Sequence, residues 1–171
     1  ITDSDGNEHT LYRDYLDQGK TVLIKVFFVN CPPCNAVAPD IQELYEQWGE
    51  GQADVEFIEL STRSSDSDAD VKGYKDRHGL TFPGAGGEGG SLTAVGPILS
   101  GTYGPYFGTP SFAVIDSNGT VNYSIGGFGQ SRLTAINDAI SATGATGIIA
   151  MNPEPSEFTI EAKDFFDNPI N

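Results

Sequence analysis

Two cysteines, Cys31 and Cys34, stand where an apolar strand pattern gives way to a helical one, and this junction constrains the fold most strongly. Residues 21–29 are rich in β-branched and aromatic side chains, as in a strand covered on both faces. From Cys31 to about Trp48, apolar residues recur at helical spacing, and a glycine follows. This order favours an α/β domain with the cysteines at the N-terminus of a helix.

A cysteine at the start of a helix is suited to redox chemistry. Unpaired main-chain N–H groups and the helix dipole favour a negative sulfur there, and the thiolate is the form that attacks a disulfide. We therefore expect Cys31 to be the nucleophile and Cys34 to be the resolving thiol. The chain contains 2 cysteines in all, so a framework of structural disulfides is excluded. A disulfide that closes so small a loop stabilises little.

Two prolines separate the cysteines. Pro32 and Pro33 suit the first helical positions, where the missing N–H costs least. They stiffen the turn and remove two donors that could have faced the thiolate. We predict that they modulate Cys31 by limiting how far its pKa is lowered.

The remaining patterns alternate between strands and helices. After the cysteine helix they predict a strand, a helix, a long Gly-rich loop, a hairpin and a final helix. The predicted ranges are a strand at 55–60, a helix at 67–77 and the Gly-rich loop at 84–108, with a short helix at 92–99 inside it. The hairpin joins strands at 112–116 and 120–125, and the final helix spans 131–141. Such an order predicts a mixed central sheet with helices on both faces. The loop segment Gly84–Gly90 is interpreted as a flexible insertion near the active-site rim.

The division of the chain follows from where the patterns end. We expect one domain over residues 1–150, and an acidic, proline-containing tail or linker over residues 151–171. The chain begins at Ile1, which favours a mature product or an excised segment, with further domains expected at either end.

Charge and motif spacing exclude several classes of function. The formal net charge of −15 argues against nucleic acid and anionic membranes as partners, and no apolar run is long enough to insert into a membrane. A zinc site at the cysteine pair would need two further ligands, and His9 and His78 lack the required spacing. The acids from Asp66 to Asp70 resemble a calcium loop but lack its glycine and closing glutamate, so a capped helix start is preferred. We expect neither a metal nor an organic cofactor.

Several of these motifs together resemble the thioredoxin superfamily, and within it the TlpA/ResA-like extracytoplasmic branch. The resemblance covers residues 1–142 and rests on motifs in chain order. These are Val22–Phe28, Cys31-Pro-Pro-Cys34, Pro39, His78–Pro83, Gly108-Thr-Pro110 before Ser111–Asp116, Asn118-Gly119 and Gly126-Gly127. It implies a thioredoxin-like fold and an extracytoplasmic location (periplasmic, cell-surface or secreted).

The resemblance also implies a substrate-binding element. By it, Pro110 is a cis proline beside the cysteines, and the main chain of Thr109 pairs with an extended substrate segment. The implied partners are protein thiols and disulfides, with an upstream redox partner.

Three positions depart from the pattern of the relatives. Asn30 replaces their tryptophan, and Lys25 and Val37 occupy the two places where they carry a buried acid. The proton acceptor for Cys34 is therefore left to water or to an unidentified group. Two interpretations of Lys25 stay open: a cation that stabilises a nearby thiolate, or a side chain that extends from the strand end and touches nothing.

The function that fits these observations is a thiol–disulfide oxidoreductase acting on protein disulfides through the CPPC pair, with reduction as the expected direction. Two alternatives stay open. One is a thiol peroxidase of the peroxiredoxin-like type, although its Pro-x-x-x-Thr/Ser-x-x-Cys pattern is missing. The other is a non-catalytic thioredoxin-like binding module of a larger surface protein.

Overall fold

The structure is a computed structural model that describes residues 1–148, so the predicted tail at 151–171 lies outside the described residues. Within the described part, five strands form one mixed sheet in the order β3-β2-β1-β4-β5. The strands are β1 (Thr21–Phe27), β2 (Val55–Ser61), β3 (Gly84–Ala85), β4 (Ser111–Ile115) and β5 (Val121–Gly126). β1, β2 and β3 run parallel, and β4 and β5 run antiparallel to their neighbours.

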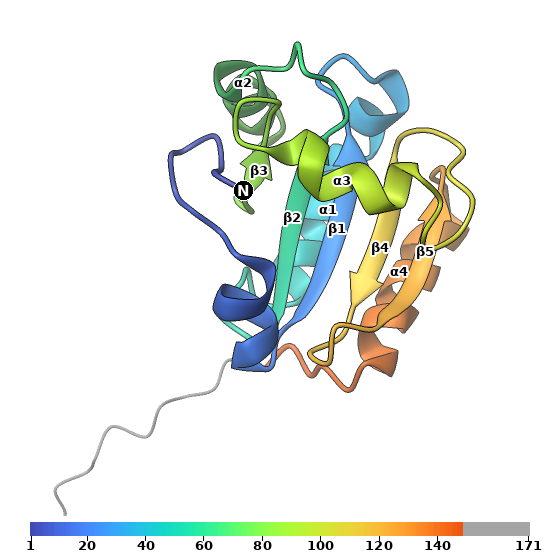
Figure 1. Ribbon diagram of the computed structural model, residues 1–171. Helices are drawn as coiled ribbons and strands as arrows, with labels where there is room; N and C mark the ends of the chain where they lie inside the picture. The colour runs from blue at the N-terminus through green and yellow to red at the C-terminus, as the bar shows by residue number, and fades with distance from the viewer. Residues whose placement is uncertain (149–171) are drawn as a thin grey trace, which may run out of the picture.

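Helices cover both faces of this sheet (Figure 1). They are η1 (Leu11–Tyr15), η2 (Leu16–Gln18), α1 (Pro32–Gln47), α2 (Asp68–His78), α3 (Ser91–Leu99) and α4 (Gln130–Ala142). In Figure 1, α3 crosses one face, and α1 and α4 lie behind the other. The predicted fold class, a mixed sheet between helices, is confirmed.

The central strand β1 explains why the sheet needs both layers. All of its residues are buried, and successive side chains point to opposite faces. Leu23 and Phe27 join the core beneath α1, α2 and α4. Val22 and Ile24 join the second core, on the side of α3 and the N-terminal helices. Lys25 shares the face of Leu23 and Phe27, so its charge points into the larger core.

Local capping chemistry defines both ends of α2, close to the predicted range 67–77. Ser67 and Asp70 form a reciprocal capping box at the start of α2, and Gly79 ends this helix with a left-handed conformation. Asp116 accepts the N–H groups of Asn118 and Thr120 in the turn between β4 and β5.

The interpretation of Gly84–Gly90 as a flexible insertion is wrong. Gly84 and Ala85 form β3 and pair with β2. Gly86, Gly87 and Gly89 pack directly on other main-chain segments: a Cβ on Gly86 would lie 2.4 Å from the Asp66 carbonyl oxygen. The glycines are therefore required by close packing, which a composition rich in glycine does not distinguish from flexibility.

Gly89→Ala tests this packing. Its added Cβ would lie 2.0 Å from the Thr2 carbonyl oxygen, so the main chain must shift, and we expect the free energy of unfolding to fall. The expected loss is about 1–3 kcal/mol, the range for overpacking. The control is Gly73→Ala in α2, where no atom lies within 4 Å of the added Cβ and a small gain in stability is expected. Denaturant unfolding of both variants decides the matter, and equal stabilities would contradict the packing argument.

Candidate functional site

The cysteine pair lies at the junction of β1 and α1. Cys31 and Cys34 form a disulfide with their Cα atoms 5.2 Å apart, and both residues are buried. Cys31 is the N-cap residue of α1, with Pro32 and Pro33 in the first helical positions. Because prolines lack an N–H, the main-chain N–H of Cys34 is the first donor of the helix, and it donates to Cys31 Sγ over 3.2 Å. The helix terminus therefore presents one main-chain donor to this sulfur.

The predicted substrate-binding element lies beside Cys31. Thr109 Oγ1 is 3.3 Å from Cys31 Sγ, and the Thr109–Pro110 peptide bond is cis. Pro110 is buried, and its carbonyl oxygen accepts the N–H of Gly127. The main-chain N–H and C=O of Thr109 make no main-chain hydrogen bond within residues 1–148. The fold thus brings together residues far apart in the chain.

Lys25 forms a buried ion pair, so the interpretation that it touches nothing is wrong. Its Nζ lies 2.8 Å from Glu59 Oε2 and 3.1 Å from the hydroxyl of Tyr74. The side chains of Lys25 and Glu59 are 1% and 0% exposed, which makes this pair fully desolvated. The register of β1 and β2 sets the two residues side by side.

The ion pair connects to the cysteine turn through Tyr74. The Tyr74 hydroxyl donates to the Cys34 carbonyl oxygen over 3.0 Å. Burial raises the pKa of Tyr74, so its hydroxyl keeps the proton that this bond needs. Burial also raises the pKa of Glu59, and the neighbouring Lys25 opposes that shift only in part. The second carboxylate oxygen of Glu59 has no hydrogen-bond partner within residues 1–148.

Sequence reasoning missed Glu59 and Tyr74. The signal for Glu59 was present: an acid in the apolar strand 55–60 and a lysine in the apolar strand 21–29 are complementary charges on strands that a crossover helix makes neighbours. Tyr74 offered no such signal, because an aromatic residue on a helix is usually core packing.

His78 and Asp66, which the sequence motifs offered as metal ligands, have other partners. His78 Nε2 lies 2.8 Å from Asn35 Oδ1 in α1. Asp66 is buried and accepts the N–H of Val29 and the hydroxyl of Ser61. Both contacts hold the segment that surrounds Cys31.

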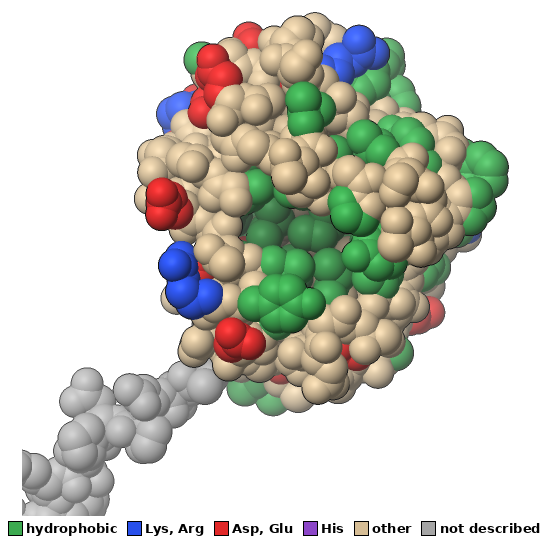
Figure 2. Space-filling model, viewed as in Figure 1, with side chains coloured by type: hydrophobic (Ala, Val, Ile, Leu, Met, Phe, Trp, Pro, Cys, Tyr) green, Lys and Arg blue, Asp and Glu red, His purple; other side chains and the backbone are tan. Residues whose placement is uncertain are grey.

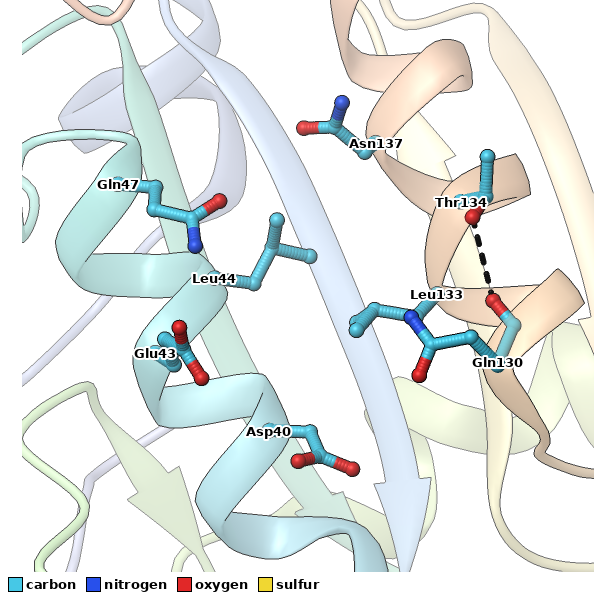
Figure 3. A pocket seen from close by; sticks show the side chains of 8 residues that line it. All are labelled: Asp40, Glu43, Leu44, Gln47, Gln130, Leu133, Thr134 and Asn137. Carbon is cyan, nitrogen blue, oxygen red and sulfur yellow. Dashed lines mark hydrogen bonds between the residues drawn. The ribbon is translucent and has the colours of Figure 1, made fainter.

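Two hollows lie away from the cysteines. A cavity of about 260 Å³ between α3 and the sheet is lined mainly by apolar side chains such as Ile24, Ile58 and Ile98 (Figure 2). An open cleft of about 340 Å³ separates α1 from α4, where Leu44 and Leu133 face each other among polar side chains (Figure 3). The lining of neither hollow includes a cysteine or Thr109.

Residues 1–148 contain neither a cluster of metal ligands nor a membrane-spanning helix. Within residues 1–148, no three His, Cys, Asp or Glu side chains gather as metal ligands would. No helix in that range has both the length and the apolar character that a membrane crossing requires.

Comparison with known proteins decides the family. The model of the family described as Redoxin matches residues 1–140. The chain belongs to the Redoxin family. The resemblance of these residues to the thioredoxin superfamily is thereby confirmed.

Individual relatives of this Redoxin chain carry related names. The thiol-disulfide oxidoreductase ResA of Halalkalibacterium halodurans is 27% identical over 66 residues, which cover 39% of this chain and 35% of that protein. The match therefore spans about a third of the relative.

Solved structures share the fold at low sequence identity. A thiol:disulfide interchange protein of the thioredoxin family from Chlorobium tepidum superposes with a TM-score of 0.65 at 21% identity, covering 84% of this chain and 90% of the other. A secreted disulfide oxidoreductase of Mycobacterium tuberculosis gives a TM-score of 0.59 at 17% identity, covering 82% and 92%.

Proposed function

We propose that this Redoxin chain is a thiol–disulfide oxidoreductase of the TlpA/ResA-like type that exchanges electrons with protein disulfides through Cys31 and Cys34. The observation that carries the proposal is the Cys31–Cys34 disulfide at the N-terminus of α1, with Thr109 Oγ1 3.3 Å from Cys31 Sγ. The names of the ResA relative and of the Chlorobium tepidum protein support it.

In the reducing direction, the reaction takes two exchange steps. The Cys31 thiolate attacks one sulfur of the substrate disulfide, the substrate S–S bond breaks, and the departing thiolate takes up a proton. Cys34 then loses its proton and attacks Cys31 Sγ, so that the second substrate sulfur leaves as a thiolate. Two electrons pass to the substrate, and an upstream dithiol donor returns the pair to its reduced form.

Thr109 and Pro110 are proposed to hold the substrate during this exchange. The free main-chain groups of Thr109 suit pairing with an extended segment next to the attacked disulfide. Pro32 and Pro33 are proposed to moderate Cys31, because they leave Cys34 as the single nearby main-chain donor.

Lys25, Glu59 and Tyr74 are proposed to position Cys34. The Lys25 and Tyr74 side chains link the buried Glu59 carboxylate to the Cys34 carbonyl oxygen. This network ends on the main chain of Cys34, so it acts on the position of the residue. The proton acceptor for the Cys34 thiol stays water or an unidentified group.

Location and partners follow from the same relationship. We propose an extracytoplasmic protein (periplasmic, cell-surface or secreted) whose substrates are protein thiols and disulfides. The structural neighbour from Mycobacterium tuberculosis is described as secreted.

The reduction potential of the Cys31–Cys34 pair tests the function and its direction. The protein is equilibrated in glutathione buffers of graded composition, and the reduced fraction is trapped by alkylation. We expect about −270 mV, the range of a thioredoxin-like reductant, whereas a value near −120 mV would identify an oxidant. A pair that never cycles, or a chain that consumes hydrogen peroxide faster than it reduces a protein disulfide, would overturn the proposal.

A further inference from the structure

Asn35, the residue after the cysteine pair, connects the main chain on both sides of Cys31. Its Nδ2 donates to the Val29 carbonyl oxygen over 3.0 Å and to the Cys31 carbonyl oxygen over 2.7 Å. The two protons of the amide are therefore both used in the loop that leads from β1 into α1. This bridge ties the segment before Cys31 to the first turn of the helix.

The other end of the Asn35 amide is held by α2. His78 Nε2 lies 2.8 Å from Asn35 Oδ1, which is an acceptor, so Nε2 must carry a proton. The His78 ring packs against Tyr74, with the ring centroids 4.8 Å apart. Burial lowers the pKa of His78, as do Arg77 and Lys25, which favours the neutral ring protonated on Nε2.

The two side chains of α2 act on the two cysteines in parallel. Tyr74 donates to the Cys34 carbonyl oxygen, and His78, one helical turn later, fixes Asn35 and through it the Cys31 carbonyl oxygen. The geometry of this turn sets the donation from the Cys34 N–H to Cys31 Sγ, which stabilises a thiolate more than a thiol. If the turn from Cys31 to Cys34 loosened, the hydrogen bond from the Cys34 N–H to Cys31 Sγ would weaken.

We propose that Asn35 and His78 form a pair of positioning residues that sets the reactivity of Cys31. The inference rests on the proposed oxidoreductase function, which it deepens by assigning residues outside the CPPC turn to the control of its nucleophile. Neither residue contacts the sulfur; both act through the main chain that carries it.

The test measures the pKa of the Cys31 thiol and the reduction potential in three variants. His78→Leu removes the donor, Asn35→Ala removes the bridge, and His78→Gln keeps an N–H group that can reach Asn35. The pKa is read from the pH dependence of alkylation of the reduced protein, on a Cys34→Ser background that leaves one thiol. His9→Leu is the matched control, because His9 bonds Asp3 and Tyr15 and has no contact with the cysteine turn.

We expect His78→Leu and Asn35→Ala to raise the pKa of Cys31 and to slow alkylation at pH 7 by about 2- to 10-fold, the equivalent of one hydrogen bond. His78→Gln should stay closer to the wild type. A variant that combines His78→Leu with Asn35→Ala should match either single variant, because the two residues act as a unit. His9→Leu should change stability alone.

Unchanged alkylation and unchanged potential in folded His78→Leu and Asn35→Ala would overturn the inference. So would a His78→Gln variant as slow as His78→Leu. Failure of the wild-type pair to cycle would overturn the proposed function instead, because the alkylation assay reads the positioning effect without turnover.

Discussion

Replacing Lys25 by methionine is expected to lower the free energy of unfolding by about 3–5 kcal/mol, because it leaves the Glu59 carboxylate buried without its partner. The side chains of Lys25 and Glu59 are 1% and 0% exposed, so water cannot replace the lost interaction. The hydroxyl of Tyr74 would also lose the donor that now reaches it from Lys25 Nζ. Denaturant unfolding of the oxidised protein measures the loss.

The pH dependence separates a lost ion pair from a general packing defect. In Lys25→Met, burial holds the pKa of Glu59 above its unfolded value, so the native state binds more protons than the unfolded state. Stability should then fall as the pH rises from about 4.3, the unfolded pKa of a glutamate, through the raised native pKa. Glu59→Gln removes the titrating carboxylate, so this fall of stability with rising pH should be missing from that variant.

The double variant Lys25→Met/Glu59→Leu completes the test. Removing both charges together should restore most of the stability, because apolar side chains of similar volume replace buried ion pairs at little cost. Parallel pH slopes in the two single variants, or a double variant as unstable as Lys25→Met, would contradict a desolvated ion pair.

The order of strands and helices could be predicted because each element carries its own pattern. The apolar run of β1, interrupted by Lys25 alone among its long side chains, and the Ser67–Asp70 capping box are local signals, and the structure confirms both elements. The glycines near residue 86 gave a local signal too, but their reason is the approach of distant main chain at Asp66, which no local pattern contains.

The candidate site also contains residues that local sequence patterns identify and residues that only distant contacts identify. Cys31 and Cys34 are neighbours in the chain, so their pairing and their place at a helix start follow from the sequence. Lys25 could be marked as unusual, but its partner depended on the register between β1 and β2. The pairing of Asn35 with His78 could not be predicted, because a hydrogen bond between two helices depends on packing that the sequence does not show.

Cys34→Ser is expected to turn the protein into a trap for its own substrates. Cys31 keeps its place at the helix N-terminus and can still attack a disulfide, but no thiol remains to release the mixed disulfide. A covalent complex, sensitive to reductant, should accumulate with a protein disulfide substrate and be visible by non-reducing electrophoresis. Multiple turnover should fall by at least about a hundred-fold, as expected when one member of a catalytic pair is removed.

The matched variant is Cys31→Ser, which should lose turnover to the same extent and trap nothing. Cys34 would be its single thiol, but it lies inside the first turn of α1, whereas Cys31 is the N-cap residue and lies beside Thr109, the proposed substrate-binding residue. The difference between the two variants therefore reports which sulfur meets the substrate. Trapping by Cys31→Ser in place of Cys34→Ser would reverse the assigned roles, and trapping by both would show that the helix N-terminus does not select the attacking sulfur.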